Sequence, residues 1–263
     1  VHVDNSALHC ETSKEKQPVP RCTVLLAQSE LLGLSAIMTQ HSPLQAGSLF
    51  AGRYAIERPL RSGGRNSMYA ASDSGTGQPC CLKLLDSRIA VDDDMVRQFE
   101  EIGNRVLKLD APNLVRILDY GIADDSSGIR RPWVVMERLL DGQDLESAAR
   151  VLPVKMEEIQ TILEQVCHGL QALHTANLVH GNLKPRNLYL IRPVGQKQVV
   201  VKLLGFGLSR LSALARSTED GGIATPIWMA PEQSQPAEIL TPSVDVWSLG
   251  LLAFYLLTRS HYW

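Results

Sequence analysis

Short apolar runs separated by turn residues fill the first half of the chain from Tyr54 onward. The runs YAIERPL, MYAASD and CCLKLLD are separated by RSGGRNS and SGTGQP, a pattern that predicts an antiparallel meander. Residues 92–109 instead repeat their apolar side chains every three or four positions, at Phe99, Ile102, Val106 and Leu109. That spacing predicts a helix with one apolar face. LVRILDYGIA and RPWVVMERLL predict two more strands, so this half is expected to be a five-stranded antiparallel sheet with one helix.

The second half of the chain is predicted to be mostly helical. Residues 156–176 carry one apolar stripe, and NLYLIR and VVVKLL predict a pair of short strands around the turn PVGQKQ. Residues 243–258 include VWSLGLLAFYLL, which is apolar nearly all round and predicts a helix buried in the centre of a lobe. The expected fold class is therefore α+β, with an antiparallel sheet in the first half and helices in the second.

Residues 1–50 are mostly polar, with one modest apolar run between residues 23 and 38. This composition predicts a flexible N-terminal extension rather than a folded element. Because the segment MTQHSPLQAGSLFAGRY begins at Met38, we hypothesise that the native chain starts there and that the first 37 residues are an addition.

Composition narrows the class of partner. With 26 basic and 28 acidic side chains the net charge is −2, so no electrostatic case exists for nucleic acid or an anionic membrane. The cysteines are odd in number and irregularly spaced, at positions 10, 22, 80, 81 and 167, which favours free thiols in a reducing cytoplasm. The apolar run near the start is too short and too polar to span a bilayer. We therefore expect a soluble, cytoplasmic protein without a membrane segment in this chain.

The segment HGNLKPRNLYL, beginning at His180, is followed by GFG at residues 205–207. These motifs resemble the catalytic loop H-R-D-L-K-x-x-N and the D-F-G motif of protein kinases. RSGGRNSMYAA, CCLK, VVMERLL, ATPIWMAPEQ and DVWSLG resemble the glycine loop, phosphate lysine, hinge, A-P-E segment and buried-helix motif of that family, in its order. The resemblance runs from about Ala51 to Trp263 and is most similar to bacterial Ser/Thr kinases, particularly those of myxobacterial type. It implies a bilobal fold: an N-lobe and hinge at residues 51–139 and a partial C-lobe at residues 140–263.

The resemblance implies a nucleotide site between the lobes. Gly63 matches the middle glycine of the phosphate-covering loop, and Arg61 and Asn66 occupy its first and third glycine positions. Lys83 matches the strand lysine that binds the α- and β-phosphates. The predicted hinge completes the set. Met136 would guard the back pocket, and the backbone from Glu137 to Leu139 would face adenine. Each motif also has a plainer interpretation, as a hairpin turn, a solvent-facing strand lysine and an edge strand.

The usual partner of the strand lysine is a helix glutamate. Counting back from APNLV, that position falls on Ile102, with Glu101 one residue earlier. One residue turns a helical side chain by about 100°, so Glu101 should point off the inward face. We expect the lysine–glutamate pair to be absent unless a local bulge rotates Glu101 back.

Two acids of the family's chemistry are replaced. Asn182 stands at the position of the catalytic aspartate, and an amide cannot accept a proton. Gly205 stands where the D-F-G aspartate binds magnesium, which leaves Asn187 as the remaining side-chain metal ligand. Lys184, which would contact the transferred phosphate, is kept, so a nucleotide such as ATP could still bind, with magnesium bound weakly or not at all. Loss of both acids should lower the rate of phosphoryl transfer by several orders of magnitude.

The retained motif residues are mostly structural: His180 and Phe206 shape the site, and Asp245 is expected to accept backbone hydrogen bonds from the catalytic loop. Glu232 would pair with an arginine from a helix later than Trp263. We therefore expect the chain to be truncated, its buried helix to show one uncovered apolar face, and a protein ending at Trp263 to be prone to aggregation.

Three functions remain open from the sequence. The first is a pseudokinase, a regulatory or scaffolding module that docks protein partners and binds nucleotide weakly without metal. The second is a Ser/Thr kinase with residual activity, in which Lys184 and a rearranged Glu101 or another carboxylate compensate. The third is an inactive partial gene product.

Overall fold

The computed structural model describes residues 44–61, 66–151, 155–193, 195, 198–208, 211, 227–234 and 240–263. All of these belong to one structural unit, residues 42–263. Gly63 and most of the segment between the GFG motif and Ile227 lie outside the described ranges, and so do the first 43 residues.

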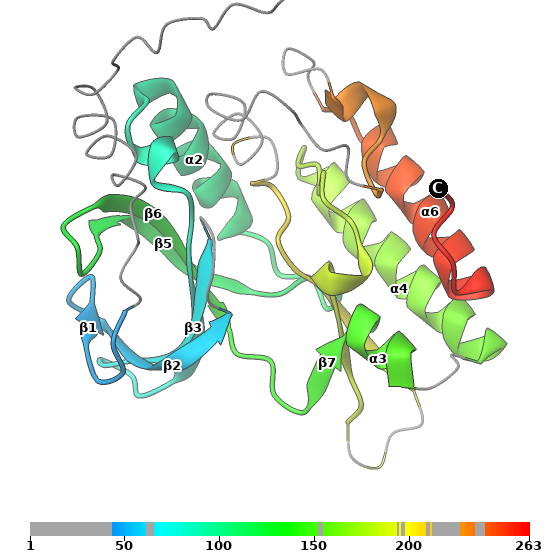
Figure 1. The fold of residues 1–263 in the computed structure, drawn as a ribbon, viewed down its shortest axis with the longest axis horizontal. Helices are drawn as coiled ribbons and strands as arrows, with labels where there is room; N and C mark the ends of the chain where they lie inside the picture. Colours follow the sequence, from blue (N-terminus) through cyan, green and yellow to red (C-terminus); the bar gives the residue numbers. More distant parts are fainter. Residues whose placement is uncertain are drawn as a thin grey trace, which may run out of the picture. The chain divides into compact units, whose positions relative to one another are not determined.

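The first half of the described chain is a six-stranded sheet with one long helix packed against it (Figure 1). Its order is β1-β2-β3-β4-β6-β5, and every neighbouring pair is antiparallel. The strands are β1 Leu49–Phe50, β2 Tyr54–Arg61, β3 Ser67–Asp73, β4 Pro79–Leu84, β5 Ile117–Asp124 and β6 Arg130–Glu137. The 3₁₀ helix η1 (Ser87–Ala90) and helix α2 (Asp93–Val106) lie between β4 and β5. The five predicted strands are present, and β1 is an addition to them.

The folded region begins before residue 51, where the sequence predicted its start, because it includes strand β1. Leu44 and Phe50 are 6% and 3% exposed, and the Leu44 N–H donates to the Tyr69 hydroxyl at 3.2 Å. The Phe50 ring packs edge-on against Trp133, with centroids 6.1 Å apart. The assignment of residues 1–50 to an extension was therefore wrong for its last seven residues. A two-residue strand is too short to show the alternation by which strands are recognised.

Helix α2 begins at a side-chain cap and packs closely on β5. Asp92 accepts a hydrogen bond from the Met95 N–H at 2.9 Å, which satisfies one free donor of the first turn. A Cβ on Gly103 would lie 2.4 Å from the Tyr120 ring, so a glycine is needed for this close approach. The contact sets the rotation of α2 and hence which of its side chains face the sheet.

The described residues of the second half form a three-stranded sheet, α-helices and short 3₁₀ helices (Figure 1). The sheet, in the order β7-β8-β9, consists of β7 Gly142–Asp144, β8 Leu188–Ile191 and β9 Val200–Leu203. The helices are α3 Leu145–Val151, α4 Met156–Thr175, η2 Pro185–Asn187, η3 Pro231–Ser234 and α6 Ser243–Thr258. The predicted strand pair and both predicted helices are present, and α6 has the predicted bounds. β7 and α3 were missed because elements of three and seven residues show too little periodicity.

One apolar core connects the two halves. Four side chains without exposed surface, from α4, β9 and α6, lie at its centre: Ile162, Leu173, Leu203 and Leu252. The same cluster continues through Phe99 and Val106 of α2 and Met136 of β6. Met136, one of the predicted nucleotide-site residues, is therefore part of this core.

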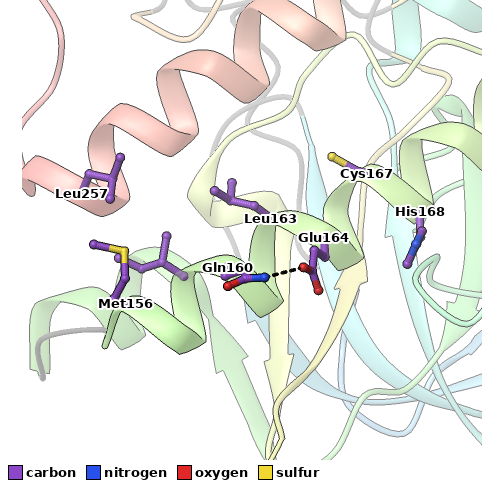
Figure 2. Close-up of a pocket in the computed structure, with 8 residues that line it drawn as sticks. Met156, Gln160, Leu163, Glu164, Cys167, His168 and Leu257 are labelled. Atoms are coloured by element: carbon purple, nitrogen blue, oxygen red, sulfur yellow. Dashed lines mark hydrogen bonds between the residues drawn. The ribbon is translucent and has the colours of Figure 1, made fainter.

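Helix α6 carries exposed apolar side chains. Val246 is 62% exposed and Leu257 is 55% exposed. Figure 2 shows Leu257 facing Met156 and Leu163 of α4 across a groove of about 450 Å³. No helix among the described residues has the length and apolar content needed to cross a bilayer.

Candidate functional site

The backbone of the HGN segment is held by one buried carboxylate. Asp245, in the first turn of α6 and 1% exposed, accepts hydrogen bonds from the N–H groups of His180 at 2.9 Å and Gly181 at 2.7 Å. His174 Nε2 of α4 lies 2.8 Å from the same carboxylate. The contact that the sequence resemblance implied for Asp245 is present, and it fixes the loop against two helices.

His180 is fully buried beneath this loop. Burial lowers the pKa of its imidazole to about 4, so the ring is neutral near pH 7. Its Nδ1 accepts a hydrogen bond from the Asn182 N–H at 3.3 Å, which requires an unprotonated nitrogen there. Phe206, 4% exposed, packs edge-on to the ring at 6.3 Å. Both buried side chains pack on the core side of the loop, where they can fix its shape.

Asn187 joins the catalytic loop to the GFG segment. Its Nδ2 donates to the Asn182 carbonyl at 2.7 Å, and its own carbonyl accepts from the Leu204 N–H at 2.8 Å. Gly205 follows directly, with a positive φ of 78°. A Cβ built there would lie 3.6 to 3.8 Å from the Asn187 amide group, in ordinary contact. The structure thus brings together the two predicted metal-ligand positions, of which one carries no side chain.

A magnesium ion does not fit this donor set. Mg²⁺ requires near-octahedral oxygen coordination and favours carboxylates. Asn187 offers one amide oxygen, Gly205 offers none, and the exposed Asn182 carries an amide in place of the acid. Among the described residues, no group of three or more potential ligands could hold a metal ion.

Lys83 lies on β4 with its amine desolvated. Burial, and after it the positive charges of Lys184 and Arg61, lowers the pKa of this amine to about 8. Within the described part of the chain, no carboxylate raises it. The predicted phosphate lysine and the predicted loop lysine are therefore close enough to repel each other, and they converge on one site.

The helix position that faces Lys83 is apolar. Ile102 lines a small pocket of about 30 Å³ together with Lys83, Met136 and Phe206, whereas Glu101 is exposed on the outer side of α2. The Ile102 Cγ2 would lie 3.1 Å from a Cβ on Gly207. Most of the other side chains that line this pocket are apolar, and no carboxylate is among them.

Lys202, which the sequence analysis did not single out, contacts Glu137 of the predicted hinge. Lys202 of β9 donates to Glu137 Oε1 at 2.8 Å and to the Leu114 carbonyl at 3.2 Å. The Glu137 N–H donates to the Arg116 carbonyl at 2.9 Å, so this amide serves the fold. Of the Glu137 to Leu139 backbone, the Glu137 carbonyl and the Leu139 groups are the better candidates for adenine. Lys202 belongs to none of the sequence motifs. It reaches Glu137 because β9 lies beside residues 113–115, which lead into β5.

Gln233 is a second missed residue. Its Nε2 donates to the Gly181 carbonyl at 2.8 Å, and its Oε1 accepts from the Ala230 N–H at 2.9 Å. It therefore ties η3 to the catalytic loop. Gln233 is the last residue of the APEQ motif, and this position in the motif is what could have pointed to it in the sequence. Neighbouring Glu232 is half-buried in η3.

Comparison with known proteins identifies the family. The model of the protein kinase domain matches residues 54–263. Serine/threonine-protein kinase PknL of Mycobacterium tuberculosis is 35% identical over 217 residues, which cover 82% of this chain and 51% of PknL. Serine/threonine-protein kinase Pkn1 of Myxococcus xanthus is 31% identical over 242 residues, which cover 91% of this chain and 32% of Pkn1. The chain belongs to the protein kinase family.

Solved structures agree with the fold. The crystal structure of the Mycobacterium tuberculosis PknI kinase domain matches with a TM-score of 0.65 at 25% identity, over 83% of this chain and 79% of that one. The predicted bilobal α+β kinase-like fold and the likeness to bacterial Ser/Thr kinases are confirmed. The chain spans about half the length of PknL and about a third of Pkn1.

Proposed function

We propose that this chain is a pseudokinase, a protein-kinase-fold module that binds a nucleoside triphosphate weakly without metal and acts by docking protein partners in the cytoplasm. The observation that carries the proposal is the composition of the site. Asn182 and Gly205 stand where the chemistry needs carboxylates, while Asp245 and His180 hold the loop in place. The shape of the site is kept, and the acids that would act on the phosphates are missing.

The retained side chains account for nucleotide binding. Lys83 and Lys184 supply positive charge on one side of the site, where phosphate oxygens are favoured. Met136 closes the back of the site, and the backbone near Glu137 and Leu139 offers groups to a base. In the proposed division, residues up to 139 form the N-lobe and hinge, and residues from 140 form the C-lobe.

The same geometry argues against phosphoryl transfer. The Asn182 amide can orient a hydroxyl but cannot accept its proton at neutral pH. Glu101, the acid that was considered as a substitute, is exposed on the far side of α2 from Lys83. The described residues can therefore bind and orient a triphosphate, and neither Asn182 nor Glu101 provides a base to complete the reaction.

Residual Ser/Thr kinase activity is the second candidate, and one observation favours it. PknL and Pkn1 are serine/threonine-protein kinases, and Lys184 and Asn187 are present here at the positions of the family motif. This candidate requires a carboxylate from outside the described residues to enter the site.

Two measurements test the proposal. ATP in the presence of EDTA should raise the melting temperature of the full chain, and labelled phosphate should not transfer to a protein substrate with or without magnesium. Lys83→Met should abolish the ATP shift, whereas Lys155→Met, which removes the same charge from an exposed position before α4, should retain it. Measurable transfer that depends on magnesium would establish the kinase candidate instead. Absence of any ATP shift would favour a module without nucleotide.

A further inference from the structure

Two ion pairs attach consecutive residues of the predicted hinge to different strands. Lys202 Nζ of β9 donates to Glu137 Oε1 at 2.8 Å, and Arg138 Nη1 donates to Glu57 Oε2 of β2 at 2.6 Å. The Lys202 and Arg138 side chains are each 18% exposed, so solvent screens these pairs less than it screens a fully exposed pair. The hinge is therefore tied to β9 as well as to the sheet that leads into it.

Glu137 is the residue on which the contacts of Lys202 meet. Its Oε1 accepts from the Arg116 N–H at 2.9 Å as well as from Lys202, and its own N–H donates to the Arg116 carbonyl at 2.9 Å. Lys202 Nζ donates in addition to the Leu114 carbonyl at 3.2 Å. One amine thus joins β9 to the segment before β5 and to the end of β6.

Strand β9 gives Lys202 a fixed base, because both neighbours of Lys202 are bonded to other segments. The Leu203 N–H donates to the Asn113 carbonyl at 2.8 Å. The Val201 N–H donates to Gln165 Oε1 of α4 at 2.9 Å. The position of the Lys202 backbone is therefore set by contacts that do not involve the hinge.

We propose that Lys202 is a positioning residue for the base of the nucleotide: by holding Glu137, it fixes the hinge backbone that receives the base. This inference rests on the proposed nucleotide binding and deepens it, because it assigns control of the base end of the site to a residue of β9. The Glu137 carbonyl and the Leu139 backbone groups can bond to a base only at hydrogen-bonding distance, a tolerance of about half an ångström. A hinge that shifts by more than this loses the base.

The size of the effect follows from the fraction of molecules whose hinge is in place. A ligand that binds one conformation loses apparent affinity in proportion to the fraction of the protein in that conformation. A hydrogen bond to a charged group changes an equilibrium constant by about tenfold or more. Lys202→Met removes an amine that donates two hydrogen bonds, so it should raise the Kd for ATP by about tenfold.

The experiment measures displacement of a fluorescent ATP analogue from the full chain in EDTA, at a temperature below the melting temperature of every variant. Lys202→Met should raise the inhibition constants of ATP and of adenosine by about tenfold each. The inhibition constant of inorganic tripolyphosphate, which has no base, should change by less than about twofold. A merely structural role of Lys202 would loosen the whole site and weaken all three ligands alike.

Further variants test whether Lys202 acts through Glu137. Glu137→Met should weaken ATP binding at least as much as Lys202→Met, and the double variant should weaken it no more than Glu137→Met alone, because both changes remove one contact. Lys202→Arg keeps the charge and the donors and should retain most of the affinity. The matched control Arg192→Met removes an ion pair with Glu158 of α4 and should leave the Kd for ATP unchanged.

The outcomes separate this inference from the function on which it rests. If the wild-type chain binds ATP in EDTA and Lys202→Met leaves its Kd unchanged, the positioning role is overturned while nucleotide binding stands. Equal weakening of tripolyphosphate, or additive effects of the Lys202 and Glu137 substitutions, would overturn the positioning role as well. If the wild-type chain binds no ATP in EDTA, both proposals are overturned.

Discussion

The carboxylate of Asp245 accepts a 2.7 Å hydrogen bond from the backbone N–H of Gly181, which stands 64 positions earlier in the chain. Gly181 has a φ of +66°, a conformation that glycine adopts without strain. The Gly181 carbonyl accepts a hydrogen bond from Gln233, so both backbone groups of this residue are held by distant side chains. The contacts keep the HGN segment in the position of a catalytic loop although its acid is gone.

Asp245→Asn should destabilise the protein by about 2 to 4 kcal/mol. The new amide carries no charge and has one acceptor oxygen for the two buried backbone N–H groups. Urea unfolding followed by circular dichroism measures the change. The control Asp124→Asn, at an exposed strand end, should change the stability by less than about 0.5 kcal/mol. If both substitutions lowered the free energy of unfolding equally, the buried hydrogen bonds of Asp245 would add no stability beyond that of an exposed carboxylate.

Gly103→Ala should destabilise the protein by about 1 to 3 kcal/mol, because the new methyl group overlaps the Tyr120 ring. The matched substitution Gly250→Ala, in α6 with no atom within 4 Å of its Cβ, should be neutral or stabilising by up to about 1 kcal/mol. Thermal denaturation of both variants distinguishes them. A stable Gly103→Ala protein would mean that α2 can move away from β5 at little cost.

Lys83→Met should stabilise the protein at pH 7 by about 1 to 3 kcal/mol, because it removes a desolvated amine whose pKa is lowered to about 8. Between pH 8 and the ordinary value of 10.5 the unfolded state binds more protons than the folded state, so wild-type stability rises with pH. The advantage of the variant should therefore shrink over that range. Lys155→Met, on the surface, should show no such trend in parallel urea titrations.

The buried imidazole of His180 should make the protein less stable in mild acid. Its pKa is about 4 in the folded state against 6.5 ordinarily, so stability is fully present above pH 6.5 and falls as the pH drops toward 4. The loss by pH 5 should be about 2 kcal/mol from this group alone. His180→Gln should reduce the slope of stability against pH between 5 and 7, and His168→Gln, exposed on α4, should leave it unchanged. Identical slopes in all three proteins would refute the assignment.

The exposed face of α6 should promote self-association. Val246→Glu with Leu257→Glu places charges on that face and should shift the protein toward monomer in light scattering. Val91→Glu, which adds a charge at an isolated position that is 83% exposed, serves as the control. A wild-type preparation that is monomeric and melts cooperatively would contradict the prediction.

Much of the fold was predictable because its long elements have clear periods. α6 begins and ends at the predicted residues, and the α2 and α4 boundaries differ from prediction by at most a few residues. β1, β7 and α3 were not predictable, since two, three and seven residues show too little alternation or helical repeat. β1 is ordered by burial of Phe50 against Trp133, a contact between residues 83 positions apart in the sequence.

The sequence by itself determined the family, the order of the motifs and the loss of acids at Asn182 and Gly205, because these depend on residue identity and spacing. The tertiary structure decided which groups meet. Arg61, at the end of β2, acts on Lys83 because β2 and β4 pair with the two edges of β3, and Lys202 of β9 reaches Glu137 at the end of β6 because distant segments pack together. Electrostatic energy depends on distance and burial, which are set when remote segments pack. The sequence alone shows that the loop lacks two acids of the kinase motifs. Only the folded chain shows that Lys184 and Arg61 act on Lys83.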